Sequence, residues 1–167
     1  MNKPVISIQL NKWDIWMDIT AWTFLILLWI YPLNHYAALP NQIPTHFGLN
    51  GKADGYGDKQ TILLLPIIAT VLNIALRILE KFPHLFNYPI TITTENASYQ
   101  YRFAIRVLRV LRILISVIFL LIVYRVLMSI QTGEHSLGKS MIACIIGLCM
   151  TPSFLTLLMW RKGRARQ

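Results

Sequence analysis

Long runs of apolar residues, separated by short polar stretches, dominate the chain. Four of them approach the length of about 20 residues that a helix needs to cross a bilayer. They predict transmembrane helices at about 19–39, 61–79, 107–130 and 140–160. The polar stretches leave no room for a separate soluble domain, so we expect residues 1–167 to form a single all-α membrane domain of four transmembrane helices.

One polar segment, residues 39–59, interrupts this pattern between the first and second predicted helices. Pro40 and Pro44 prevent the first helix from continuing through it, because each lacks a backbone N–H. Asn-Gly and Asp-Gly pairs are typical of tight turns. We therefore predict an ordered loop that folds back on itself, either as a structural element or as a recognition surface. Its motif residues are Pro44, His46, Asn50, Gly51, Asp54, Gly55, Asp58 and Lys59.

Composition agrees with a membrane protein. Apolar residues make up 55% of the chain and charged residues 14%, whereas about a quarter of the residues in soluble domains are charged. The net charge of +9 does not indicate a nucleic-acid partner, because the basic residues flank apolar runs and do not form one face of a soluble element. The lipid bilayer is the expected partner.

The placement of Lys and Arg predicts the orientation of the chain. With four spans, twelve basic residues fall on one side of the membrane and four on the other. The larger group is Lys3, Lys12, Arg77, Lys81, Arg102, Arg106, Arg109, Arg112, Arg161, Lys162, Arg164 and Arg166, and the smaller is Lys52, Lys59, Arg125 and Lys139. Because basic residues concentrate in cytoplasmic segments, we expect both termini in the cytoplasm and the loop outside it.

Four arginines recur on one face at the start of the third predicted span. On a helix, Arg102, Arg106, Arg109 and Arg112 lie within an arc of about 120°. Voltage-sensing helices carry similar repeats, but their charges meet acidic partners within the bilayer, and the nearest acids here, at positions 18 and 80, lie at helix ends. We therefore predict a lipid-contacting basic stripe that binds anionic lipids at the cytoplasmic face.

Arg125 lies farther along the same span, between apolar residues. An arginine near the middle of a membrane helix costs about 2.5 kcal/mol or more unless it finds a partner or reaches the interface. Two hypotheses stay open: Arg125 extends to lipid phosphate at the outer interface, or it pairs with Asp54 or Asp58 and tethers the loop. Within the second span, Asn73 is expected to hydrogen-bond to a neighbouring helix.

Candidate chemistry is sparse. His46, Asp54 and Asp58 carry an imidazole and two carboxylates, which are ligands for a divalent metal ion, although their spacings match no standard metal motif. No hydrolase nucleophile motif is present. Cys144 and Cys149 lie five residues apart and diverge on a helix, so they are not expected to form a disulfide with each other. The sequence therefore favours a protein that is not an enzyme, without a cofactor, over a metal-dependent one.

The segment 39–59 resembles the bacterial domain-of-unknown-function family 1648, which begins SdpI-like toxin-immunity membrane proteins. The resemblance covers residues 22–79, two apolar helices and the loop between them. It is carried by Pro40, Ile43, Pro44, His46, Gly51, Asp54, Gly55 and Lys59. It implies a small bacterial immunity or resistance protein of the cytoplasmic (inner) membrane, whose outer loop recognises a peptide toxin or another secreted or envelope-derived agent.

The alternative function is a membrane-embedded metal-dependent enzyme, or an ion-handling protein, that uses His46, Asp54 and Asp58. Four spans are few for a path through the membrane within one chain. A transport role would therefore imply a homo-oligomer.

Overall fold

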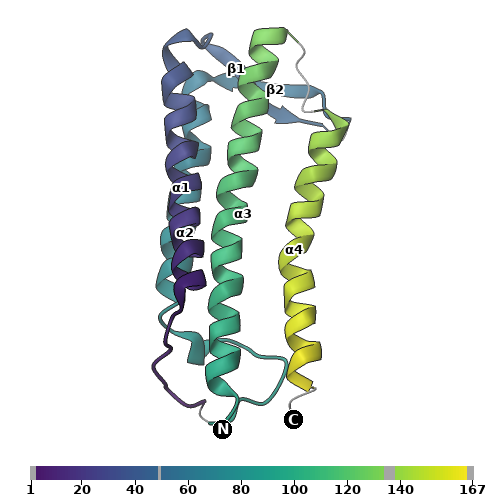
Figure 1. Cartoon of the computed structure of the whole chain (residues 1–167). Coiled ribbons are helices and arrows are strands. Elements are labelled where there is room, and N and C mark those ends of the chain that lie inside the picture. Colours follow the sequence, from purple (N-terminus) through teal and green to yellow (C-terminus); the bar gives the residue numbers. More distant parts are fainter. Residues whose placement is uncertain (1–2, 49, 134–137, 165–167) are drawn as a thin grey trace.

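The structure is a computed structural model that describes residues 3–48, 50–133 and 138–164. Four long helices run side by side in it, with a β-hairpin across one end (Figure 1). Arg166, one of the basic residues counted above, lies outside the described residues. The elements are α1 (Lys12–His35), η1 (Tyr36–Ala38), β1 (Gln42–Phe47), β2 (Ala53–Asp58), η2 (Lys59–Leu63), α2 (Leu64–Leu79), η3 (Pro83–Leu85), α3 (Ala97–Thr132) and α4 (Lys139–Arg164).

Helix α1 begins at a capping box. The Asn11 side chain accepts hydrogen bonds from the backbone N–H groups of Trp13 and Asp14, and the Asp14 carboxylate accepts one from the Asn11 N–H. This arrangement satisfies donors that the first turn of a helix otherwise leaves without partners. The helix therefore starts well before the span predicted at 19–39. Pro32 lies inside it without ending it.

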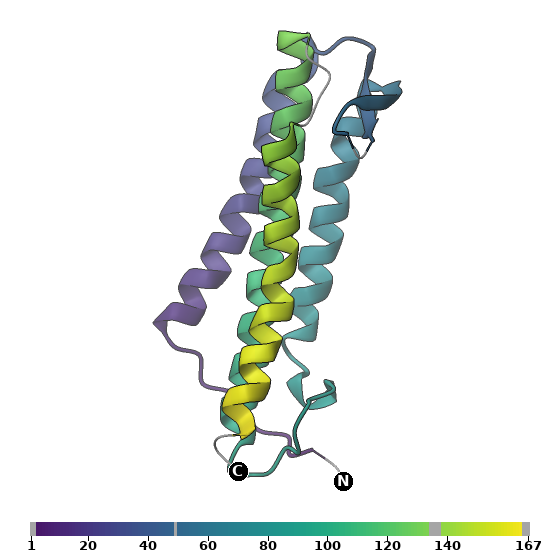
Figure 2. The ribbon, with the colours of Figure 1, turned by 90° about the vertical axis from the view of Figure 1, so that its right-hand side faces the viewer.

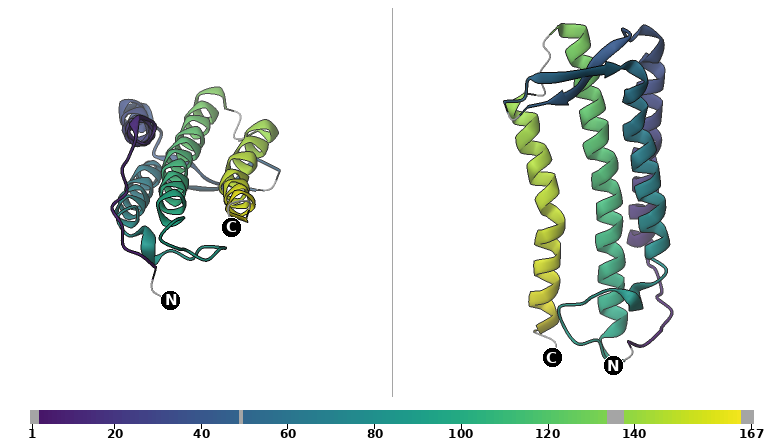
Figure 3. Two further views of the ribbon diagram at one scale, coloured as in Figure 1. Left: turned by 60° about the horizontal axis from the view of Figure 1, so that its bottom comes forward. Right: turned by 180° about the vertical axis from the view of Figure 1, so that it is seen from behind.

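Helix α3 is the longest element and the centre of the bundle. Its 36 residues correspond to about 54 Å at 1.5 Å per residue, which exceeds the hydrocarbon thickness of about 30 Å. Gly133, with φ of 72°, ends the helix in the left-handed conformation that glycine adopts readily. Helices α1, α2 and α4 all contact α3 (Figure 3).

Three helical segments of the described chain are long and apolar enough to cross a membrane: Lys12–Ala38, Lys59–Leu79 and Ala97–Thr132. In α4, the described apolar stretch is the shorter Met141–Thr151. The protein is thus a helical membrane protein, as the sequence predicts. Cys144 and Cys149 are both free and exposed on α4, which confirms the expectation that they do not pair with each other.

The chain is mostly helical, as expected, and the segment predicted as a loop contains a two-stranded antiparallel sheet formed by β1 and β2. The sheet lies at the end of the bundle opposite the described start of the chain and the end of α4 (Figures 1 and 2). A core cluster, which includes Leu28 of α1, Ile43 of β1 and Leu127 of α3, joins the hairpin to the helices.

Polar groups also connect the helices. Asn73 of α2 is fully buried, and its Nδ2 donates to Ser116 Oγ of α3 at 3.2 Å. The predicted bond from Asn73 to a neighbouring helix is therefore confirmed. Trp29 Nε1 of α1 donates to Thr70 Oγ1 of α2 at 3.0 Å. Such bonds contribute about 0.6 kcal/mol each between membrane helices.

Candidate functional site

The hairpin is built by its turn and by an irregular first strand. Gly51 has φ of 77°, and the Asn50 side chain accepts from the Lys52 N–H at 2.9 Å. A backbone bond between Gly48 and Lys52 closes the turn. The register shifts between Pro44 and His46, where the strand tolerates a proline because the ladder is already interrupted.

His46 and Asp54 form the polar pair of the hairpin. His46 Nδ1 and Asp54 Oδ1 are hydrogen-bonded, and the two side chains are 74% and 53% exposed. A Cβ built on Gly55 would lie 3.0 Å from His46 Cβ, so a larger residue at position 55 would displace the imidazole. The pair therefore lies on the outer surface of the hairpin, where a partner can reach it.

Asp58 does not join this pair. It lies opposite Gln42 at the far end of the ladder, whereas His46 lies opposite Gly55. Its carboxylate instead accepts from the Gln60 N–H at 2.8 Å and caps η2. The predicted metal set of His46, Asp54 and Asp58 is therefore not assembled, and the described residues contain no cluster of three potential ligands.

Lys59 faces back towards the end of the first helix. Its Nζ lies 5.3 Å from the centre of the Tyr36 ring in η1, a cation–π geometry. The Lys59 backbone N–H also donates to Asn41 O at 3.0 Å. Lys59 thus connects the two ends of the hairpin segment and is not part of the His46 surface.

A cavity of about 480 Å³ lies beneath the hairpin. The hairpin contributes Ile43, Pro44 and Phe47 to its lining, and helix α3 contributes Ile122 and Val126. The remaining lining residues are Thr45, Gly57, Thr61, Ile62, Leu64, Leu65 and Ile68. The cavity is therefore mostly apolar, and its volume falls in the range of about 300–1,000 Å³ that small-molecule sites occupy.

The predicted tether from Arg125 to Asp54 or Asp58 is not among the ion pairs of the described residues. Asp54 pairs with His46, and Asp58 caps η2. Arg125 is half-buried, and its Nη2 lies 2.7 Å from where a Cβ on Gly138 would be. The guanidinium therefore lies against the start of α4.

At the opposite end of the bundle, two of the four arginines of the predicted lipid-contacting stripe are buried in protein. Arg109 and Arg112 are 1% and 0% exposed, so protein surrounds both. Arg106 Nε lies 2.6 Å from the carboxylate of Asp14, which is fully buried. Arg102 is half-buried, and its Nε has no hydrogen-bond partner among the residues that the structure describes.

Glu80, at the end of α2, is the centre of this cluster. It is 5% exposed, and three arginines bind its carboxylate. Arg77 Nη1 and Arg109 Nε approach Oε2 at 2.8 and 3.0 Å, and Arg112 Nη1 approaches Oε1 at 3.0 Å. Asp18 of α1 adds a contact of 2.6 Å to Arg112. We call Asp14, Asp18, Arg77, Glu80, Arg106, Arg109 and Arg112 the buried ionic cluster.

The sequence contains a signal for this cluster. Asp14 and Asp18 are four residues apart and share one face of α1, and Arg106, Arg109 and Arg112 repeat every third residue on α3. In the sequence alone, Asp18 and Glu80 lie at the ends of predicted helices and have no evident relation to these arginines. Because α3 starts at Ala97, its arginines lie level with the ends of α1 and α2.

The fold and its sites define a multi-pass helical membrane protein with a β-hairpin between its first two long helices. Residues 23–70 match the Domain of unknown function (DUF1648), which confirms the resemblance noted from the loop motif. The chain belongs to this family. The matched segment includes the whole hairpin but not the arginine-bearing α3.

A protein of Archaeoglobus fulgidus described as "Uncharacterized protein" is 30% identical to the chain, over 65% of the chain and 67% of that protein. The similarity therefore extends well beyond the 23–70 segment. No solved structure matches the chain.

Proposed function

We propose that the protein recognises a membrane-active agent, such as a peptide toxin, at the hairpin and at the apolar cavity beneath it. The role is that of an immunity or resistance factor, like the SdpI-like proteins whose loop motif the hairpin resembles. The single observation that carries the proposal is the cavity of about 480 Å³, roofed by Ile43, Pro44 and Phe47. An apolar cavity suits an agent that itself partitions into membranes, because both exclude water.

The hairpin also offers a polar contact surface beside the cavity. The exposed His46–Asp54 pair supplies hydrogen-bonding groups that an apolar cavity lacks. Binding sites commonly combine an apolar pocket with a few polar groups that fix orientation. In this proposal the cavity supplies affinity and the His46–Asp54 pair supplies specificity.

The proposal includes an orientation. The hairpin faces outward from a cytoplasmic membrane, and the described start of the chain and the end of α4 face the cytoplasm. The bias in basic residues supports it, and the described start of the chain and the end of α4 lie at the end of the bundle opposite the hairpin (Figure 1).

Cysteine labelling tests this orientation. In a variant in which Cys144 and Cys149 are serine, a membrane-impermeant maleimide should label Lys52→Cys in intact cells. It should label Lys81→Cys only after lysis. The opposite pattern would place the hairpin in the cytoplasm and refute an external recognition role.

A survival assay tests the function. Cells that express the protein are challenged with a panel of membrane-active peptides and compared with cells that carry an empty vector. Ile68→Trp fills the cavity from α2, and Ile67→Trp is the matched control, since Ile67 is equally exposed (46% against 45%) but does not line the cavity. Ile68→Trp should abolish protection and Ile67→Trp should retain it.

Two outcomes would contradict the proposal. If the wild-type protein changes sensitivity to no peptide of the panel, the immunity role is wrong. If Ile68→Trp protects as well as the wild type, the cavity is not the recognition site.

A further inference from the structure

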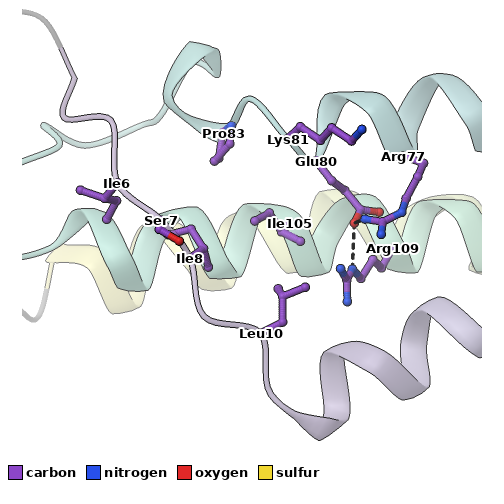
Figure 4. Close-up of a pocket in the computed structure, with 10 residues that line it drawn as sticks. All are labelled: Ile6, Ser7, Ile8, Leu10, Arg77, Glu80, Lys81, Pro83, Ile105 and Arg109. Atoms are coloured by element: carbon purple, nitrogen blue, oxygen red, sulfur yellow. Dashed lines mark hydrogen bonds and ion pairs between the residues drawn. The ribbon is translucent and has the colours of Figure 1, made fainter.

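A second cavity, of about 320 Å³, lies at the end of the bundle opposite the hairpin. Its walls are the segment before α1, the end of α2 with η3, and the early part of α3 (Figure 4). It directly contacts the buried ionic cluster, because Arg77, Glu80 and Arg109 line it. In Figure 4 these three side chains gather at one end of the cavity.

The charge at this cavity is predominantly positive. Arg77, Lys81 and Arg109 line it together with a single carboxylate, that of Glu80. Both Glu80 oxygens already accept from arginines, at 2.8–3.0 Å. Within the described residues, Lys81 forms no ion pair, so it adds an uncompensated cation at the rim.

The whole buried ionic cluster also contains more positive than negative charges. It contains four arginines and three carboxylates, so it carries one surplus positive charge when all seven groups are ionised. Within the described residues, Arg112 contacts Asp18 and Glu80 through Nη1, while its buried Nε and Nη2 have no hydrogen-bond partner. An uncompensated charge in a low-dielectric interior is costly. An anion bound to Arg77 or Arg109 would compensate the surplus positive charge. The Glu80 carboxylate would then interact more strongly with Arg112.

The opposite wall of the cavity is largely apolar. Ile6, Ile8 and Leu10 extend along it from the segment before α1, and Ile105 faces them from α3 (Figure 4). This segment is held in place because Tyr101 Oη of α3 donates to Pro4 O at 2.9 Å. The cavity therefore combines a cationic end with an apolar wall.

We propose that this cavity binds a phosphate-bearing anion, either as the headgroup of an anionic lipid or as free phosphate. Arginine forks and a lysine ammonium are the groups that proteins use to bind phosphate oxygens. The apolar wall accommodates the glycerol and upper acyl part when the anion is a lipid headgroup. The site is distinct from the hairpin and does not depend on the function proposed for it.

The experiment uses the full chain purified in a neutral detergent, with two probes. Short-chain phosphatidylglycerol is titrated and followed by native mass spectrometry, with short-chain phosphatidylcholine as the lipid control. Inorganic phosphate is titrated at constant ionic strength and followed by the shift in unfolding temperature. Saturable binding of phosphatidylglycerol but not phosphatidylcholine identifies a lipid headgroup, and a saturable effect of phosphate alone identifies a free anion. If neither probe binds saturably, the proposal is wrong.

Lys81→Gln tests the cationic end without disturbing the arginine–carboxylate contacts, since Lys81 is exposed. We expect Lys81→Gln to weaken, by about fivefold, the binding of whichever probe the wild-type protein binds saturably, because one basic contact is lost. Lys12→Gln is the matched control, because it removes an exposed charge of α1 that does not line the cavity. Equal weakening by both variants would indicate diffuse electrostatic attraction and would overturn the site.

Ser7→Trp tests the cavity itself, because Ser7 lines it and the substitution fills it without changing its charge. Gln9→Trp is its control, exposed on the same segment but outside the lining. Ser7→Trp should abolish saturable binding while Gln9→Trp retains it. Binding unaffected by Ser7→Trp would also overturn the site.

Discussion

Replacing Glu80 by glutamine should strongly destabilise the helical bundle. Glu80 is 5% exposed, and its carboxylate contacts three arginines. Removal of one partner from a buried ion pair costs about 3–5 kcal/mol, because the remaining charge stays buried without compensation. The size of the loss depends on which arginines keep another partner.

The structure indicates that most of the cost falls on Arg109. Arg112 keeps Asp18 at 2.6 Å, and Arg77 is 38% exposed and can reach solvent. Arg109 is 1% exposed, and among the described residues its remaining hydrogen bond is the one to the backbone carbonyl of Asp14. We therefore expect Glu80→Gln to lower the free energy of unfolding by about 3 kcal/mol, the lower end of the range.

The assay is reversible unfolding in mixed detergent micelles, followed by tryptophan fluorescence. Trp22 is a suitable reporter, because its ring lies 5.1 Å from the guanidinium of Arg112. The control Glu95→Gln removes an exposed carboxylate that lies outside the cluster. It should change stability by no more than about 0.5 kcal/mol.

A double-mutant cycle tests the reasoning. Glu80→Gln combined with Arg109→Met should be less destabilised than the sum of the two single variants, by about 1.5 kcal/mol or more. The second substitution removes the charge that the first leaves uncompensated. Additive effects would refute the view that Glu80 acts by neutralising Arg109.

Three further predictions concern single residues. Asn73→Ala should lower the free energy of unfolding by about 0.6 kcal/mol through loss of the bond to Ser116, measured in the same assay. If neither Asn73→Ala nor Ser116→Ala changes stability, the interhelical role is contradicted. Gly51→Ala should cost about 1–2 kcal/mol because of its φ of 77°. Gly147 lies inside helix α4, with no described atom within 4 Å of an added Cβ, so Gly147→Ala should leave stability unchanged or raise it by up to about 1 kcal/mol; a similar loss in both variants would refute the turn argument. Burial raises the pKa of Tyr88 above its usual value of 10, so its contribution to stability is complete below pH 10 and declines as the pH rises beyond that. Unfolding measured between pH 8 and 11 should show this decline in the wild type but less of it in Tyr88→Phe, and identical profiles would contradict it.

Much of the fold was accessible from the sequence. The apolar runs that became α1, α2 and α3 are long enough to cross a bilayer, and a helix satisfies its own backbone polar groups there without help from distant residues. The Asn-Gly turn and the prolines of the loop marked the position of the hairpin, since their constraints act within a few residues. The family resemblance was carried by the same short segment.

The partners of the charged side chains were decided only by the tertiary structure. Whether Arg109 meets lipid phosphate or Glu80 depends on how far α3 extends past α2 and on which face it turns inward. Lipid phosphate and the Glu80 carboxylate can both accept hydrogen bonds from a guanidinium. The helical repeat of arginines therefore does not predict which of the two Arg109 contacts. In the same way, antiparallel pairing set the register that brought His46 to Asp54 and moved Asp58 to the far end of the hairpin. Residue spacing fixes what each helix or strand can present, whereas packing between elements fixes what it meets.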